Sequence, residues 1–140
     1  MIGVLIVTHG ALADELLAAA RVIAAEDLPR FRALSLDWNV GLAEARTRIS
    51  AAAGALDDGD GVIVLTDMFG DTPSNAAFSL AEENRVEVVT GVNLPMVVRL
   101  GCSGAPTLSL HDLARAIELK GRRSIARAEP VPAARRGQDA

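Results

Sequence analysis

Short apolar runs recur along this chain, each separated from the next by a segment with a helical period. Four runs predict β-strands, at residues 2–7, 31–36, 62–65 and 86–89. Three of them are almost continuously apolar, which is typical of parallel strands that are covered on both faces. The second run contains Arg32, so we expect that strand to lie nearer a sheet edge.

Apolar residues between these runs recur at intervals of three or four positions, which predicts amphipathic helices. The first helix follows the positions Leu12, Leu16, Ala20 and Ile23, and the second follows Leu42, Ala45, Ile49, Ala52 and Leu56. Three further helices are expected at 73–83, 94–100 and 109–120. Pro73 and Pro95 suit a first helical turn, and Ser109 with Asp112 resembles a capping box.

Alternating strands and helices predict an α/β fold with a doubly wound, mainly parallel sheet and helices on both faces. The small size favours the flavodoxin-like strand order 2-1-3-4. We expect one domain over residues 1–128 and a loose tail at 129–140, which is rich in Pro, Ala and Arg. The stretch SIARA, at 124–128, has the composition of a short additional edge strand.

The predicted strand order brings two polar side chains together. Strands 1 and 3 would be neighbours whose connections leave in opposite directions, and ligands bind in the crevice at such carboxyl ends. His9 ends the first strand and Asp67 ends the third. A carboxylate that bonds one imidazole nitrogen fixes the tautomer and leaves the other as a nucleophile. The helix start at Pro73 also suits an anion, so we expect phosphoryl chemistry here.

Composition excludes several other classes of protein. The net charge of −4 and 3% aromatic residues argue against a nucleic-acid partner. Cys102 is the only cysteine, which rules out an internal disulfide and a cysteine-rich zinc site and favours a cytoplasmic location. The first strand lacks the basic flank of a signal peptide, and no apolar run approaches the roughly 20 residues of a membrane span. No nucleotide-binding glycine motif is present, and we expect no cofactor.

Three motifs together resemble one known family. They are VTHG after the first strand, DMFGDTPSN after the third, and GVNLPMVVRL at 91–100. In these motifs, and over roughly residues 1 to 128, the chain resembles the enzyme IIA component of the mannose-type (mannose-fructose-sorbose) phosphotransferase system. The last two motifs are long and unusual, so their combination is specific, whereas THG alone is weak.

The resemblance implies a phosphocarrier that accepts a phosphoryl group from HPr and passes it to a IIB component. His9 would carry the group, Asp67 would orient the ring, and Thr72 would lie beside the phosphoryl oxygens. Gly10, Gly70 and Asp71 would complete that phosphoryl site. The family also implies a homodimer in which a C-terminal strand, here SIARA, crosses to the partner's sheet.

Two departures from the family pattern stand out. Asp71 occupies a position where the family usually has a second glycine, and its charge would repel a phosphoryl dianion. No IIB domain follows the tail, which suggests either a separate subunit or a regulatory role. Partner docking is expected from the start of the fourth helix, on Leu94, Pro95, Met96 and Arg99.

Simpler interpretations remain open for single residues. A histidine at a strand end is often only a solvated loop residue, Asp67 can cap a turn, and Thr72 can be a plain N-cap. His111 is expected on an exposed helix face. A chelatase-like metal enzyme is a further alternative, since such enzymes also place histidine and glycine after an early strand, but no second histidine is expected nearby. A regulatory module read by another protein is the third class.

Overall fold

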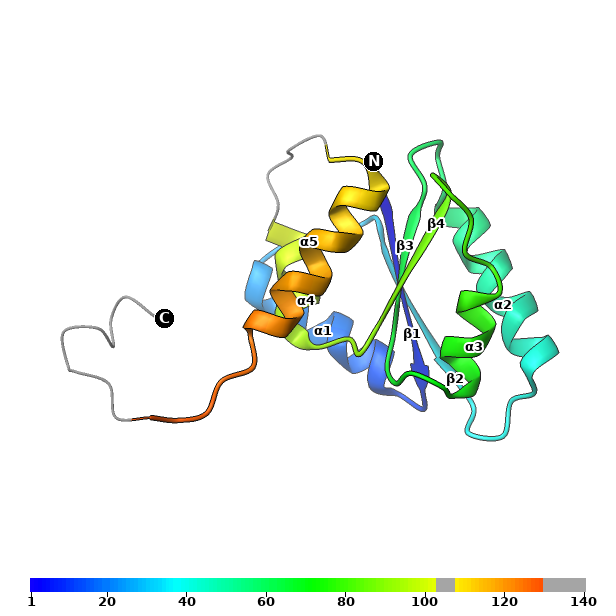
Figure 1. The fold of residues 1–140 in the computed structure, drawn as a ribbon, viewed down its shortest axis with the longest axis horizontal. Coiled ribbons are helices and arrows are strands. Elements are labelled where there is room, and N and C mark those ends of the chain that lie inside the picture. Colours follow the sequence, from blue (N-terminus) through cyan, green and yellow to red (C-terminus); the bar gives the residue numbers. More distant parts are fainter. Residues whose placement is uncertain (103–107, 130–140) are drawn as a thin grey trace.

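The computed structural model describes residues 1–102 and 108–129, which form a parallel sheet with helices on both faces (Figure 1). The sheet has the order β2-β1-β3-β4. Its strands are β1 (Gly3–His9), β2 (Phe31–Leu36), β3 (Val62–Thr66) and β4 (Val86–Thr90). All three strand pairs are parallel, and β2 lies at an edge. The predicted fold class and strand order are therefore confirmed.

Five helices connect or follow the strands. They are α1 (Leu12–Ala24), α2 (Leu42–Leu56), α3 (Thr72–Phe78), α4 (Leu94–Cys102) and α5 (Leu110–Arg123). Helices α2 and α3 cover one face of the sheet, and α1, α4 and α5 cover the other (Figure 1). Ser109 caps α5 as predicted, because its hydroxyl accepts the Asp112 backbone N–H at 3.1 Å.

The two central strands carry both layers of the core. Ile6 and Leu65 pack with α1, α4 and α5, whereas Val7 and Val64 pack with α2 and α3. Every residue of β3 is buried, as are the first six of β1. Burial on both faces explains why these two segments are continuously apolar rather than alternating. This burial also holds the carboxyl ends of β1 and β3 in place, and His9 and Asp67 lie at those ends.

Helix α3 is shorter than the sequence suggested. We expected it to extend to residue 83, but it ends at Phe78, and the Ser79 hydroxyl bonds the Ala76 carbonyl at 2.7 Å. Two further turns follow, and Glu82 then makes an antiparallel bridge to Val86. These turns return the chain to the sheet within a few residues, which a longer helix would prevent.

The chain after α5 leads away from the sheet (Figure 1). Residues 125–129 have no regular structure, so the expected edge strand at 124–128 does not form within a single chain. Most of the expected tail, residues 130–140, lies outside the described residues. Within the described ranges, no helix has the length and apolar content needed to cross a bilayer.

Candidate functional site

The ends of β1 and β3 bring His9 and Asp67 into direct contact. His9 is the last residue of β1, and Asp67 directly follows β3, whose Thr66 is the register partner of Val7. The Asp67 Oδ2 atom lies 2.9 Å from His9 Nδ1 and accepts the His9 backbone N–H at 2.9 Å. The predicted pair is thus present, at the carboxyl edge of the sheet.

The contact with Asp67 favours one tautomer of the His9 ring. An ionised carboxylate only accepts hydrogen bonds, so Nδ1 carries the hydrogen in this contact, and in the neutral form of the ring the lone pair then lies on Nε2. Burial raises the pKa of Asp67, but hydrogen bonds from the His9 backbone, the His9 ring and the Met68 backbone outweigh it and hold the pKa below its ordinary value. The stabilisation from this carboxylate is therefore full above pH 3.8 and is lost as pH falls through the lower folded-state value.

Asp71 adds a second carboxylate to the same ring nitrogen. Its Oδ1 atom accepts the Ser74 backbone N–H at 3.1 Å and so caps α3. Its Oδ2 atom lies 3.2 Å from His9 Nδ1, is buried, and has no hydrogen-bond partner in the described structure. The N-cap of α3 is therefore Asp71, and the alternative that Thr72 serves as this cap is wrong. Thr72 is instead the first residue of the helix.

The loop between β3 and α3 is held by one buried side chain. The Ser74 hydroxyl contacts the Thr66 hydroxyl at 2.7 Å, the Met68 carbonyl at 2.5 Å and the Thr90 hydroxyl at 3.2 Å. It thereby joins the ends of β3 and β4 to the loop. No role for Ser74 was predicted from the sequence, although a small polar residue in the first turn of a helix is the usual signal for such a contact.

The two glycines assigned to the phosphoryl site both adopt a left-handed backbone. Gly10 has a φ of 55° and Gly70 a φ of 88°, conformations that other residues rarely adopt. The Thr72 hydroxyl makes no hydrogen bond within the described ranges. The Ser74 N–H is already bonded to Asp71, so the helix start offers fewer free donors than the sequence suggested.

Trp38 belongs to this site, and the sequence analysis missed it. It follows β2, and its indole stacks on the His9 ring with centroids 4.7 Å apart and an angle of 11° between the planes. Its side chain is nevertheless 79% exposed. Two signals were available, since Trp38 is the only tryptophan and it lies two residues beyond the end of a strand that neighbours β1.

The site also contains a set of atoms that could bind a metal ion. One donor atom each from His9, Asp67 and Asp71 lies within 4.8 Å of the others. Two carboxylates, rather than the second histidine considered from the sequence, are the further donors beside His9. Nδ1 of His9 already contacts both carboxylates, so a cation that binds through this nitrogen would have to replace the ring hydrogen.

Exposed apolar side chains surround the site at the carboxyl edge. Trp38 and Leu42 follow β2, while Met68 and Phe69 follow β3. Phe69 is 74% exposed and contacts Phe78 at the end of α3, with ring centroids 5.9 Å apart. Exposed clusters of large apolar side chains are typical of protein contact surfaces.

The docking residues expected on α4 need correction. Met96 is only 2% exposed and packs in the core against α5, where a Cβ atom on Gly121 would lie 2.6 Å from its sulfur. It is therefore unavailable to a partner. Leu94 and Pro95 are half-buried at the start of α4, on the same edge of the sheet as His9.

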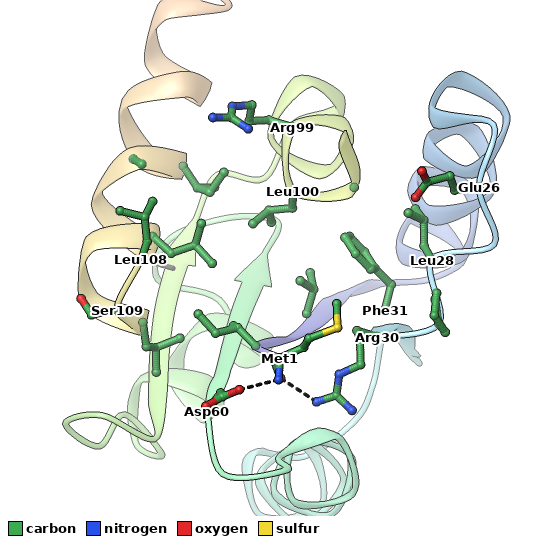
Figure 2. Close-up of a pocket in the computed structure, with 18 residues that line it drawn as sticks. Met1, Glu26, Leu28, Arg30, Phe31, Asp60, Arg99, Leu100, Leu108 and Ser109 are labelled. Atoms are coloured by element: carbon green, nitrogen blue, oxygen red, sulfur yellow. Dashed lines mark hydrogen bonds and ion pairs between the residues drawn. The ribbon is translucent and has the colours of Figure 1, made fainter. Parts of the chain in front are cut away.

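Arg99 lies near the opposite edge of the sheet. It lines a hollow of about 770 Å³ beside the amino ends of the strands, together with Met1, Asp60 and Arg30 (Figure 2). The Met1 amino group pairs with Asp60, and Arg30 donates to the Met1 carbonyl at 3.0 Å. Arg99 therefore does not border the His9 site. Gly101 and Leu108 also line this hollow, on either side of residues that lie outside the described ranges.

His111 lies apart from the site, on the exposed side of α5. Its side chain is 64% exposed, and Nδ1 lies 3.1 Å from Glu87 Oε1. The expectation of a surface histidine is thus confirmed, and His111 provides a matched control for His9.

Comparison with known proteins gives consistent matches over most of the chain. A family model described as the PTS system fructose IIA component matches residues 3–118. The mannose-specific EIIAB component of Escherichia coli K12 is 30% identical over 151 residues, covering 95% of this chain and 44% of the relative. The fructose-specific EIIA component of Bacillus subtilis is 38% identical over 65 residues, covering 46% of this chain and 44% of the relative. These matches span less than half the length of each curated relative.

Solved structures show the same fold. The mannose/sorbose specific IIA subunit from Enterococcus faecalis superposes with a TM-score of 0.81 at 23% identity, covering 94% of this chain and 97% of that one. The PTS IIA protein associated with the fucose utilization operon of Streptococcus pneumoniae gives a TM-score of 0.74 at 29% identity, covering 89% and 91%.

Proposed function

Because the chain belongs to the mannose-type enzyme IIA family of the phosphotransferase system, we propose that it carries phosphoryl groups between proteins on His9. In this proposal HPr is the donor and a IIB component is the acceptor. One observation carries it: Nδ1 of His9 faces two carboxylates, so the lone pair of Nε2 is left for chemistry.

The transfer moves the phosphoryl group from an imidazole nitrogen of the donor to an imidazole nitrogen of His9. The Nε2 lone pair attacks phosphorus, the bond between phosphorus and the donor's imidazole nitrogen breaks, and its electron pair returns to the donor. The His9 ring then carries a positive charge, which the Asp67 carboxylate stabilises through the Nδ1 hydrogen. Passing the group to IIB reverses these steps.

The phosphoryl oxygens would lie among the residues that the sequence analysis assigned to them. Gly10 and Gly70 bring backbone close without side chains, and the Thr72 hydroxyl is available to donate. Asp71 also lies here and adds a negative charge. The exposed apolar residues Leu42, Met68 and Phe69 would contact the donor and acceptor proteins in turn.

Replacing Asp67 with Asn tests the orienting carboxylate. The amide can offer its NH₂ to Nδ1, which would move the ring hydrogen to Nε2 and remove the nucleophile. We expect the rate of phosphoryl acceptance to fall about a hundredfold or more, measured by rapid quench with phospho-HPr. Asp27→Asn, the same change at an exposed position after α1, should leave the rate unchanged. An unchanged rate in Asp67→Asn would refute this role.

Replacing Asp71 with Gly restores the residue usual in the family. Asp67 is the closer acceptor of the single Nδ1 hydrogen, so Asp71 Oδ2, which lies 3.2 Å from this nitrogen without a hydrogen bond in the described part of the chain, adds a negative charge that repels the incoming dianion. We expect acceptance to become about tenfold faster. The lost N-cap should cost only a few tenths of a kcal/mol when glycine replaces it. Slower acceptance would show that Asp71 assists transfer.

The central experiment uses the unaltered protein. Incubation with phosphoenolpyruvate, enzyme I and HPr should produce an acid-labile phosphohistidine that tandem mass spectrometry assigns to His9 rather than His111. Proton-coupled ³¹P and ¹⁵N NMR would assign the group to Nε2. The absence of an adduct with competent partner proteins would overturn the proposal.

A regulatory role is the second candidate, and the additional negative charge of Asp71 beside His9 favours it. In that case the phosphorylation state would be read by another protein, without sugar transport. Affinity capture from the native host distinguishes the two, since a transport role requires recovery of a IIB component. A cytoplasmic location, a homodimer with exchanged SIARA segments and a domain boundary near residue 128 remain parts of this proposal. Size-exclusion chromatography with light scattering tests the dimer.

A further inference from the structure

Trp38 is a large apolar side chain that lies largely in solvent, yet one face of it is ordered against His9. The rings are nearly parallel, 11° apart, with centroids separated by 4.7 Å. Its other face is open, because the side chain is 79% exposed. An exposed indole contributes little hydrophobic stabilisation, so burial does not explain why Trp38 stacks on the ring of the proposed nucleophile.

The backbone around Trp38 is shaped to permit the stack. The Gly10 N–H donates to the Leu36 carbonyl at 2.8 Å, which ties the turn after β1 to the end of β2. A Cβ atom on Gly10 would lie 3.2 Å from the indole Nε1 and 3.6 Å from Cε2. Gly10 therefore serves the left-handed turn and also leaves room for the indole.

Trp38 completes the enclosure of the His9 ring. Asp67 and Asp71 lie at the Nδ1 edge, Trp38 covers one face, and the His9 side chain is only 16% exposed. We propose that Trp38 is a positioning residue, which fixes the plane of the ring so that the Nε2 lone pair meets the incoming phosphorus in line. This inference rests on the function proposed above.

The same contact favours the phosphorylated state. A ring substituted on both nitrogens is positively charged, and an indole face attracts a cation. The stack therefore becomes stronger as the phosphoryl group arrives, and an interaction that strengthens along the reaction accelerates it. The indole also keeps water from one side of the phosphorus–nitrogen bond, which slows the hydrolysis of the adduct.

The stack itself can be measured without any activity. The ring current of Trp38 should move the His9 ring-proton resonances upfield relative to those in Trp38→Ala, and Trp38→Phe should give an intermediate position. The His111 resonances should not change in any variant, because His111 lies on α5 against Glu87. Identical His9 positions in wild type and Trp38→Ala would overturn the proposal.

The functional test separates positioning from docking. At saturating phospho-HPr, Trp38→Ala should accept the group about tenfold more slowly than wild type, and its adduct should hydrolyse faster. Trp38→Phe should recover most of both properties, whereas Trp38→Leu, which is apolar without an aromatic face, should not. Circular dichroism melts would verify that each variant folds, which is expected because the side chain is largely exposed.

Failure of the Trp38 role and failure of the proposed function give different results. If wild type accepts the phosphoryl group and Trp38→Ala matches it at saturating donor, only the role of Trp38 falls. The same holds if Trp38→Ala changes only the concentration of HPr needed for half-maximal rate, since Trp38 would then be a docking residue. If wild type itself accepts no group, the proposed function falls and this inference with it.

Discussion

Replacing His9 with Asn will abolish phosphohistidine formation while keeping the local structure. The Asn amide nitrogen lies where Nδ1 lies in histidine, so it can still donate to Asp67 Oδ2. The backbone N–H of residue 9 also keeps its bond to Asp67. No nitrogen remains at the Nε2 position, so no group can attack phosphorus. Phosphate incorporation from labelled phosphoenolpyruvate should therefore fall to the level of a reaction without this protein.

His9→Ala should be equally inactive but less stable. Its methyl group cannot bond to Asp67 or Asp71, so two carboxylates that are only 14% and 11% exposed lose the imidazole that both contact. His111→Asn is the matched control, and it should be phosphorylated at the wild-type rate because His111 is exposed on α5. Labelling of His9→Asn, or loss of labelling in His111→Asn, would show that His9 is not the acceptor.

Replacing Ile63 with Ala will cause a large loss of stability. Ile63 lies in the central strand β3 and is fully buried against the layer formed by α1, α4 and α5. Removing its branched side chain forfeits hydrophobic burial and leaves a cavity, which costs about 2–5 kcal/mol of unfolding free energy. The denaturation midpoint in urea should fall accordingly, with an unchanged slope.

The control for this substitution is Ile23→Ala. Ile23 lies in α1 but is 57% exposed, so the same chemical change should alter the unfolding free energy by less than about 0.5 kcal/mol. Equal losses in the two variants would contradict the assignment of Ile63 to the core. They would also weaken the argument that the rigid β3 strand positions Asp67.

The central part of the fold was predictable because it depends on patterns that repeat. β1 and β3 are buried on both faces, so their sequences are continuously apolar, and the alternation with helices then determines the parallel order. The meeting of His9 and Asp67 followed directly, since it requires only that neighbouring strands end at the same edge.

The errors arose where a single side chain could make several contacts. Asp71 caps α3 in place of Thr72, and both residues are suitable caps by type. Met96 continues a helical pattern, and only packing against Gly121 shows that it is buried. Arg99 follows one turn later on the same helix, but α4 carries it toward the amino ends of the strands. Trp38 was overlooked because stacking between a strand end and a loop leaves no periodic signal.

One carboxylate links the ring of His9, the proposed nucleophile, to the backbone of a helix. Asp71 holds the Ser74 N–H with one oxygen and faces His9 with the other. A change in the charge of the imidazole therefore alters the electrostatic environment of the first turn of α3, because the Asp71 side chain contacts both. Ser74 in turn contacts Thr90, at the end of β4, so the loaded and unloaded forms can differ in the rigidity of that edge. Amide hydrogen exchange at Thr72, Ser74 and Asn75 would then report the state of the ring.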